Sequence, residues 1–168
     1  STMYKRILVP LDGSDNAYYA LEHAIALAKV FDSQLFLLNV IDVNRFGVYS
    51  PDVFTSAAPD MMSFDQAQSK KLLERAQDQV AAHQLHAETI RQTGVPKVTI
   101  AVDVPKAQNI DLIVIGRSGT NAISRLFLGS TTAYVVRNTE ANVTVVNMPN
   151  DEAEEVEQTG DVSADDSK

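Results

Sequence analysis

Three glycines in the C-terminal half of the chain have a spacing suited to binding phosphate. Two residues separate Gly116 from Gly119, and nine residues separate Gly119 from Gly129. An apolar run at residues 112–115 predicts a buried strand before the first glycine, and residues 131–136 predict the start of a helix after the last. Glycine lets backbone N–H groups approach an anion closely, and a helix N-terminus adds partial positive charge. The pattern therefore predicts that a nucleotide's phosphates bind between this strand and this helix.

Polar side chains around these glycines extend the candidate phosphate site. Hydroxyl groups at the start of the predicted helix can donate to phosphate oxygens, and they belong to Ser130, Thr131 and Thr132. The intervening loop adds Arg117, Ser118, Thr120 and Asn121, with Arg125 as a second cation. Any one of the glycines alone could simply close a turn. The full set, placed between a strand and a helix, favours a binding loop.

Two commoner phosphate loops are excluded by the same residues. A P-loop has a lysine after its last glycine, but Ser130 follows Gly129 directly. The dinucleotide fingerprint places three glycines within six residues, and the interval between Gly119 and Gly129 is too long for it. An interval of nine residues fits a loop that arches over a triphosphate.

The chain alternates predicted strands and helices. Strands are predicted at residues 4–10, 34–42, 87–93, 112–115 and 142–147. Helices are predicted at residues 14–31, 63–85, 94–109 and 131–138. Pro105 is expected to stop or kink the third helix, and residues 43–62 are expected to form an irregular connection. We predict an α/β fold over residues 1–149: a single doubly wound domain whose five-stranded parallel sheet, in the order 3-2-1-4-5, carries helices on both faces.

This strand order also predicts where a ligand binds. The first and fourth strands lie side by side, and ligands of such sheets bind beyond the carboxyl ends of the strands at this point. Asp12 and Gly116 follow those two strands and are expected to meet, although they are far apart in the sequence. Asp12 can accept a hydrogen bond from a ribose hydroxyl or an adenine amine. The alternative for Asp12 is a structural role in an Asp-Gly turn.

Three segments resemble the universal stress protein family in order and spacing. They are residues 7–14, residues 111–116 and the glycine motif that ends at Ser130, and the resemblance covers about residues 4–148. It implies the ATP-binding type of this family, with the same sheet topology and a homodimer formed through the last strand. It further implies that Asp12 lies beside the ribose or adenine and that backbone groups of Pro10 and Val40 line the base pocket. A Mg²⁺ ion could accompany the triphosphate, bound by phosphate oxygens, water and Asp12.

The composition restricts the partners and the compartment. Of the net charge of −8, residues 150–168 carry −7, because they hold eight acidic residues and Lys168. We expect this acidic segment to be a disordered tail. No basic stripe predicts nucleic-acid binding, and no apolar stretch approaches the roughly 18 residues that cross a membrane. The absence of cysteine fits a cytoplasmic protein. No protein metal site is predicted, because no carboxylate cluster accompanies His83 and His86 on their predicted helix.

We therefore expect a cytoplasmic ATP-binding protein of the universal stress type that acts as a nucleotide-dependent sensor or switch. Hydrolysis should be slow or absent, because the motif supplies no general base. A homodimer is expected through residues 142–147, because an uncharged β-branched edge needs a partner, whereas residues 87–93 form a polar edge.

Two alternatives remain open at this point. The first is an enzyme that uses ATP for nucleotidyl or phosphoryl transfer, with its acceptor pocket in residues 43–62. The second is an interaction module whose nucleotide site is vacant, and the intact glycine motif disfavours it.

Overall fold

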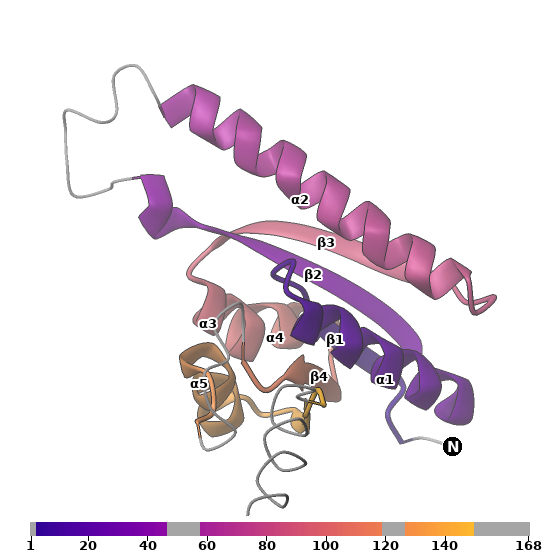
Figure 1. The fold of residues 1–168 in the computed structure, drawn as a ribbon. Helices are drawn as coiled ribbons and strands as arrows, with labels where there is room; N and C mark the ends of the chain where they lie inside the picture. Colours follow the sequence, from indigo (N-terminus) through magenta and orange to yellow (C-terminus); the bar gives the residue numbers. More distant parts are fainter. Residues whose placement is uncertain (1–2, 47–57, 119–126, 150–168) are drawn as a thin grey trace, which may run out of the picture.

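A computed structural model of the chain describes residues 3–46, 58–118 and 127–149. Five parallel strands form one sheet in the order β3-β2-β1-β4-β5, with helices on both faces (Figure 1). The strands are β1 (Arg6–Pro10), β2 (Gln34–Asp42), β3 (Ala87–Gly94), β4 (Leu112–Gly116) and β5 (Asn142–Val146). The helices are α1 (Asp15–Phe31), α2 (Ala58–Ala81), α3 (Pro96–Val98), α4 (Val104–Gln108) and α5 (Ser130–Asn138). The predicted fold class and strand order are confirmed.

The alternation of side chains along the strands divides the interior into two cores. Ile7 and Val9 of β1 pack with buried residues of α1 and α2 on one face of the sheet. Leu8, between them, packs on the other face with Ile100 and with Val135 of α5. All five residues of β4 are buried, which explains why this strand is an uninterrupted apolar run. β1 and β4 are therefore fixed from both faces, and their carboxyl ends are rigid supports for a site.

Helix α1 begins where the sequence predicts. Ser14 is its N-cap, and the Ser14 hydroxyl oxygen accepts a hydrogen bond from the Ala17 N–H at 3.3 Å. Gly13, just before it, has a φ of +86°, a conformation that glycine adopts without strain. The turn from β1 into α1 is therefore set by the Asp-Gly-Ser sequence itself.

The predicted bounds of the second helix are wrong at both ends. Helix α2 begins at Ala58, five residues before the predicted start, so residues 58–62 are helical and not part of an irregular connection. Pro59 is compatible with this start, because the first turn of a helix needs no N–H from that position. The helix ends at Ala81, so His83 and His86 do not share a helix face. His83 instead lies 3.1 Å from the Glu22 carboxylate of α1.

The predicted third helix is a composite of three segments. β3 extends to Gly94 and α3 starts at Pro96, so the helix begins two residues later than predicted. A π-helical turn at Thr99–Asp103 then leads into α4, and the chain stays helical through Pro105 to Gln108. A proline in a regular helix lacks a hydrogen bond and clashes with the carbonyl four residues earlier. The wider turn just before Pro105 relieves that conflict, so the proline distorts the helix without ending it.

The two edges of the sheet are the predicted ones. β3 forms one edge and β5 the other. No helix in the described residues is both long enough and apolar enough to cross a membrane. The predicted acidic tail, residues 150–168, lies outside the described residues.

Candidate functional site

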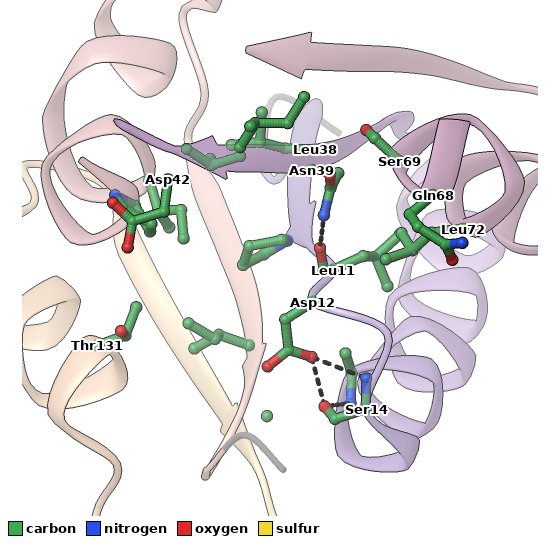
Figure 2. Close-up of a pocket in the computed structure, with 18 of the residues that line it drawn as sticks. Leu11, Asp12, Ser14, Leu38, Asn39, Asp42, Gln68, Ser69, Leu72 and Thr131 are labelled. Atoms are coloured by element: carbon green, nitrogen blue, oxygen red, sulfur yellow. Dashed lines mark hydrogen bonds between the residues drawn. The ribbon is translucent and has the colours of Figure 1, made fainter. Parts of the chain in front are cut away.

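A pocket of about 350 Å³ opens at the carboxyl ends of β1, β2 and β4. It lies at the predicted position, beyond the strands that meet where the strand order reverses. Seven of the residues predicted from the sequence line it: Pro10, Asp12, Val40, Gly116, Ser118, Thr131 and Thr132. Figure 2 shows Asp12 and Thr131 on opposite sides of the same space. The fold therefore brings together two halves of the site that are far apart in the sequence.

The remaining predicted residues divide into two groups. Gly119, Thr120, Asn121 and Arg125 lie outside the described residues. Arg117, Gly129 and Ser130 are described but do not line the pocket. The Arg117 guanidinium lies 3.5 Å from the Phe127 carbonyl oxygen and 3.4 Å from Asn147 Oδ1, so it links the loop to the end of β5.

Asp12 has one carboxylate oxygen engaged by the protein and the other turned to the pocket. Oδ1 accepts hydrogen bonds from the Ser14 N–H at 2.9 Å and from the Ser14 hydroxyl at 2.5 Å. Figure 2 shows the second oxygen pointing away from Ser14, into the open space. Asp12 thus stabilises the turn and still offers an acceptor to a ligand. The two interpretations of Asp12 from the sequence, a turn residue and a ligand-binding residue, are therefore compatible.

The backbone of β2 offers a donor and an acceptor beside Asp12. Pairing of β1 with β2 ends at Pro10 and Leu38, while β2 continues along β3 as far as Asp42. The Leu38 carbonyl accepts from the Leu11 N–H at 2.8 Å, so backbone groups of even-numbered β2 residues point toward β1. Backbone groups of alternate residues in a strand point the same way. The N–H and C=O of Val40 therefore point past the end of β1, along one edge of the pocket.

The start of α5 is held against the end of β4 by two hydrogen bonds. The Gly129 N–H donates to the Arg117 carbonyl at 2.9 Å, and the Thr132 hydroxyl donates to the Gly116 carbonyl at 2.8 Å. Both glycines are closely packed: a Cβ on Gly129 would lie 3.1 Å from the Ser118 Cα, and one on Gly116 would lie 3.0 Å from a backbone oxygen of α1. Gly129 thus lets the start of α5 approach the loop closely, and Gly116 lets the end of β4 approach α1.

The start of α5, beside the pocket, has N–H groups without partners in the helix. The first bond inside α5 runs from the Ala133 N–H to the Gly129 carbonyl, so the N–H groups of Ser130, Thr131 and Thr132 have no partner within the helix. Such groups, together with the helix dipole, favour a bound anion. The Thr132 hydroxyl, predicted as a phosphate donor, already donates to Gly116 and is buried. Thr132 therefore positions the helix, and Thr131 is the hydroxyl that lines the pocket without such a role.

One side of the pocket, which was not predicted from the sequence, is formed by α2 and the 3₁₀ turn before it (Val43–Phe46). Asp65, Gln68 and Ser69 of α2 line this side, and Asp65 Oδ2 lies 3.4 Å from Nε of Arg45 in the turn. The signal was present in the pattern of α2, because Asp65 and Ser69 continue, at helical spacing, the buried stripe formed by Leu73, Ala76 and Val80. A polar residue in such a stripe marks the point where the stripe passes over a cavity.

Titration and metal chemistry add little to the description of the pocket. Burial raises the pKa of the Tyr18 phenol above its usual value, and the nearby Arg75 guanidinium, 3.8 Å from the ring centroid, partly opposes this rise in pKa. No group of three or more histidine, aspartate or glutamate side chains that could bind a metal is found within residues 3–46, 58–118 and 127–149.

Known proteins are similar to this chain in sequence and in fold. The chain is 30% identical over 150 residues to a universal stress protein of Methanocaldococcus jannaschii, an alignment that covers 89% of this chain and 86% of that protein. The solved structure of universal stress protein UspA from Lactobacillus plantarum superposes with a TM-score of 0.75 at 33% identity, over 87% of this chain and 99% of that one.

Two more distant structures share the fold and were solved with nucleotides. A universal stress protein in complex with cAMP has a TM-score of 0.64 at 23% identity, over 86% of this chain and 98% of that one. A universal stress protein family member from Arabidopsis thaliana with AMP bound has a TM-score of 0.63 at 22% identity, over 88% of this chain and 94% of that one.

The family model for universal stress proteins matches residues 3–147, which span every strand and helix described above. The sequence resemblance is thereby confirmed over the whole sheet and the pocket at its carboxyl edge. This chain belongs to the universal stress protein family.

Proposed function

We propose that this protein binds ATP in the pocket at the carboxyl ends of β1, β2 and β4. The observation that carries the proposal is that one pocket combines three features suited to the parts of a nucleotide. The start of α5 offers N–H groups suited to phosphate. Asp12 offers a carboxylate oxygen suited to a ribose hydroxyl, and Val40 offers a backbone donor and acceptor suited to the edge of a base.

The charges around the pocket fix the orientation of the nucleotide in this proposal. Three carboxylates line the pocket, and they belong to Asp12, to Asp42 at the end of β2 and to Asp65 on α2. The lining residues from β4 and α5, by contrast, are uncharged in the described part of the chain. Phosphates are repelled by carboxylates and attracted by the helix start. The triphosphate therefore lies toward Gly116, Ser118 and Thr131, and the base lies against Pro10 and Val40.

Residues outside the described part of the chain complete the proposed site. Gly119, Thr120 and Asn121 are assigned to the phosphates on their sequence positions alone. In this proposal a Mg²⁺ ion accompanies the triphosphate, bound by phosphate oxygens, water and Asp12. The AMP and cAMP bound to the two distant family structures support an adenine nucleotide as the ligand.

The proposed role is that of a nucleotide-dependent switch with slow or no hydrolysis. The described residues of the β4–α5 connection that line the pocket are glycine, serine and threonine, which supply no general base next to the phosphates. The alternative function, transfer of a nucleotidyl or phosphoryl group, requires an acceptor pocket, which the sequence analysis placed in residues 43–62. Part of that segment, residues 47–57, lies outside the described residues, and no observation on the described part favours a transferase.

We also propose that the protein is a cytoplasmic homodimer formed through β5. β5 is an edge strand, and one of its faces packs on the core through Val143 and Val145. Exposed apolar side chains occur in the segments before and after β5: Phe127 before α5, Val136 in α5 and Met148 two residues after β5. An uncharged edge strand leaves backbone groups that a second copy could pair with around a two-fold axis. The cytoplasmic location rests on the absence of cysteine.

Isothermal titration calorimetry of the purified protein tests the binding proposal. Affinity should increase from AMP to ADP to ATP, because each added phosphate meets the N–H groups of α5 and its loop. A phosphate-release assay on the same samples should show turnover far below the roughly 1 s⁻¹ of slow metabolic enzymes. Failure to bind any adenine nucleotide would overturn the proposal, and fast turnover would overturn the switch role alone.

A further inference from the structure

The buried stripe of α2 changes from apolar to polar where it passes over the pocket. Leu73, Ala76 and Val80 pack in the core, but Ser69 and Asp65, one and two turns closer to the helix start than Leu73, line the pocket. A solvent-facing helix surface would explain polar residues there, but both are buried, with 9% and 2% of their surface exposed. Burial of polar groups is costly unless they gain partners.

Ser69 has no such partner among the described residues. Its hydroxyl oxygen is buried and makes no hydrogen bond, the only side-chain atom of this kind in the described part of the chain. Figure 2 shows the hydroxyl pointing away from α2 and toward β2, on the pocket side. A buried hydroxyl without a partner lowers the stability of the folded protein. A group that enters the pocket and bonds to this hydroxyl would offset that cost.

Asp65 lies one helical turn from Ser69 on the same face of α2, and one of its carboxylate oxygens takes part in an ion pair. Its Oδ2 faces the Arg45 guanidinium at 3.4 Å, and Arg45 itself is 59% exposed, so solvent weakens this pair. The carboxylate can accept hydrogen bonds but cannot donate them when ionised. Asp65 therefore selects for a ligand group that carries hydrogen-bond donors, and it disfavours phosphate.

The location of this side of the pocket identifies which part of the nucleotide it meets. α2 packs along β2, and Asn39 and Ile41 of β2 line the same pocket. They flank Val40, whose backbone N–H and C=O are proposed to bind the edge of the base. Leu72 of α2 adds an apolar surface suited to a flat ring. The α5 helix start, where the phosphates are proposed to bind, belongs to the opposite face of the sheet.

We propose that Asp65 and Ser69 recognise the purine base. Asp65 accepts a hydrogen bond from the exocyclic amine, whose other hydrogen is left for the Val40 carbonyl, and the Ser69 hydroxyl donates to a nitrogen of the same ring system. This inference rests on the proposed function, since it assigns specificity within that site. It makes α2 a part of the site and gives the protein a preference for purines that carry an amine.

Ser69→Ala gives the first test, by thermal melting and by calorimetric titration with ATP. Removal of an unpartnered buried hydroxyl should leave the melting temperature of the unliganded protein unchanged or raise it. The same change should weaken ATP binding about tenfold, the order expected for one hydrogen bond. Ser63→Ala, on the exposed side of α2, is the control and should alter neither quantity. Unchanged ATP affinity in Ser69→Ala would mean that the hydroxyl bonds only water, and it would overturn the role of Ser69.

Asp65→Asn gives the second test. The affinities of the wild-type and variant proteins are each measured for two ligands, ATP and purine riboside 5′-triphosphate, which lacks the amine. Loss of the amine should weaken binding to the wild-type protein at least fivefold more than binding to Asp65→Asn, because a hydrogen bond from the amine to a charged carboxylate is stronger than one to the neutral oxygen of asparagine. Asp78→Asn, an exposed position of α2, should retain the wild-type ratio. Equal ratios in wild type and Asp65→Asn would overturn the role of Asp65 while leaving ATP binding intact. Failure of the wild-type protein to bind ATP would overturn this inference together with the proposed function.

Discussion

At the scale of single residues, the site depends on groups that serve the fold and the ligand at once. Asp12 holds the turn into α1 through Oδ1 and presents its other oxygen to the pocket. Val40 lies in the part of β2 that extends beyond the last pair with β1, where the strand is still fixed by pairing with β3. Both residues are thus fixed by contacts that leave a polar group free: the second carboxylate oxygen of Asp12, and the backbone N–H and C=O of Val40. These groups are presented to a ligand in a fixed position, which lowers the entropy cost of binding.

Asp12→Asn separates the two roles of this residue. Asparagine retains a carbonyl oxygen for the Ser14 N–H and hydroxyl but replaces the free carboxylate oxygen by an amide donor. The melting temperature should change little, whereas the dissociation constant for ATP, measured by calorimetry, should increase about tenfold or more. Asp103→Asn, at an exposed position away from the pocket, should change neither value. Wild-type ATP affinity in Asp12→Asn would remove Asp12 from the binding site.

At the scale of elements, the position of α5 decides whether its N–H groups can meet a phosphate. The helix start is tied to β4 through Gly129 and through the buried hydroxyl of Thr132. Neither contact touches a ligand directly. Each nevertheless sets the distance from the helix to the strand end, so the phosphate end of the site is a property of the β4–α5 junction.

Thr132→Val tests this junction with a side chain of nearly the same shape. The change leaves the Gly116 carbonyl without its partner in a buried place, which should lower the free energy of unfolding by about 1–3 kcal/mol in urea titrations. ATP affinity should fall as well, because the helix start is less firmly held. Thr89→Val, at an exposed position of β3, is the control and should leave the unfolding free energy within about 0.5 kcal/mol of wild type. A stable Thr132→Val protein would show that the hydrogen bond does not hold the junction.

The elements also show how far the sequence predicts the structure. β4 and the β1–α1 turn were predictable because burial on both faces and an Asp-Gly-Ser turn leave local signals. The start of α2 was predicted too late because residues 43–62 were assigned to an irregular connection, although Pro59 stands in the first turn of the helix, where a proline is tolerated. Pro105 was expected to stop or kink its helix: the helix does not stop there, and the π-helical turn before the proline is the distortion that replaces a stop.

Part of the candidate site could be predicted from the sequence and part could not. Residues adjacent to strand ends, such as Asp12 and Gly116, were found because strand order alone brings them together. Asp65 and Ser69 were missed, because polar residues in a helix resemble a solvated face until the packing of that face is known. The role of Arg117 as a counter-charge was inferred from its place in the motif, whereas its guanidinium lies beside Asn147.

At the scale of the whole molecule, the two edges of the sheet differ in chemistry. β3 exposes charged and polar side chains, while β5 has no charged residue. Val145→Lys should therefore shift the protein from dimer to monomer in light scattering coupled to size-exclusion chromatography, under conditions where a melting curve shows that the variant is folded, because Val145 also packs against the core. Thr89→Lys places the same charge on the opposite edge and should leave the dimer intact. A wild-type protein that is monomeric at micromolar concentration would contradict the proposed dimer.

The strong negative charge of residues 150–168 poses a separate question for the whole molecule. Because this segment carries −7 and the remainder of the chain only −1, we expect it to repel a nucleotide and not to form part of the site. A chain that ends at Asn150 should keep its melting temperature and bind ATP at least as tightly, most clearly at low salt. A large loss of stability or affinity in the shortened chain would show that the acidic segment contacts the domain.

An ATP titration followed by ¹H–¹⁵N correlation spectra tests the central claim most directly, because it reports on individual backbone amides. We predict saturable shifts that are largest for the amides of Val40, Ser118 and the first turn of α5, with small shifts along β3 and in the C-terminal half of α2. That pattern would place the base at β2 and the phosphates at the helix start. Saturable shifts confined to another part of the surface, or no saturable shift at millimolar ATP, would contradict the account.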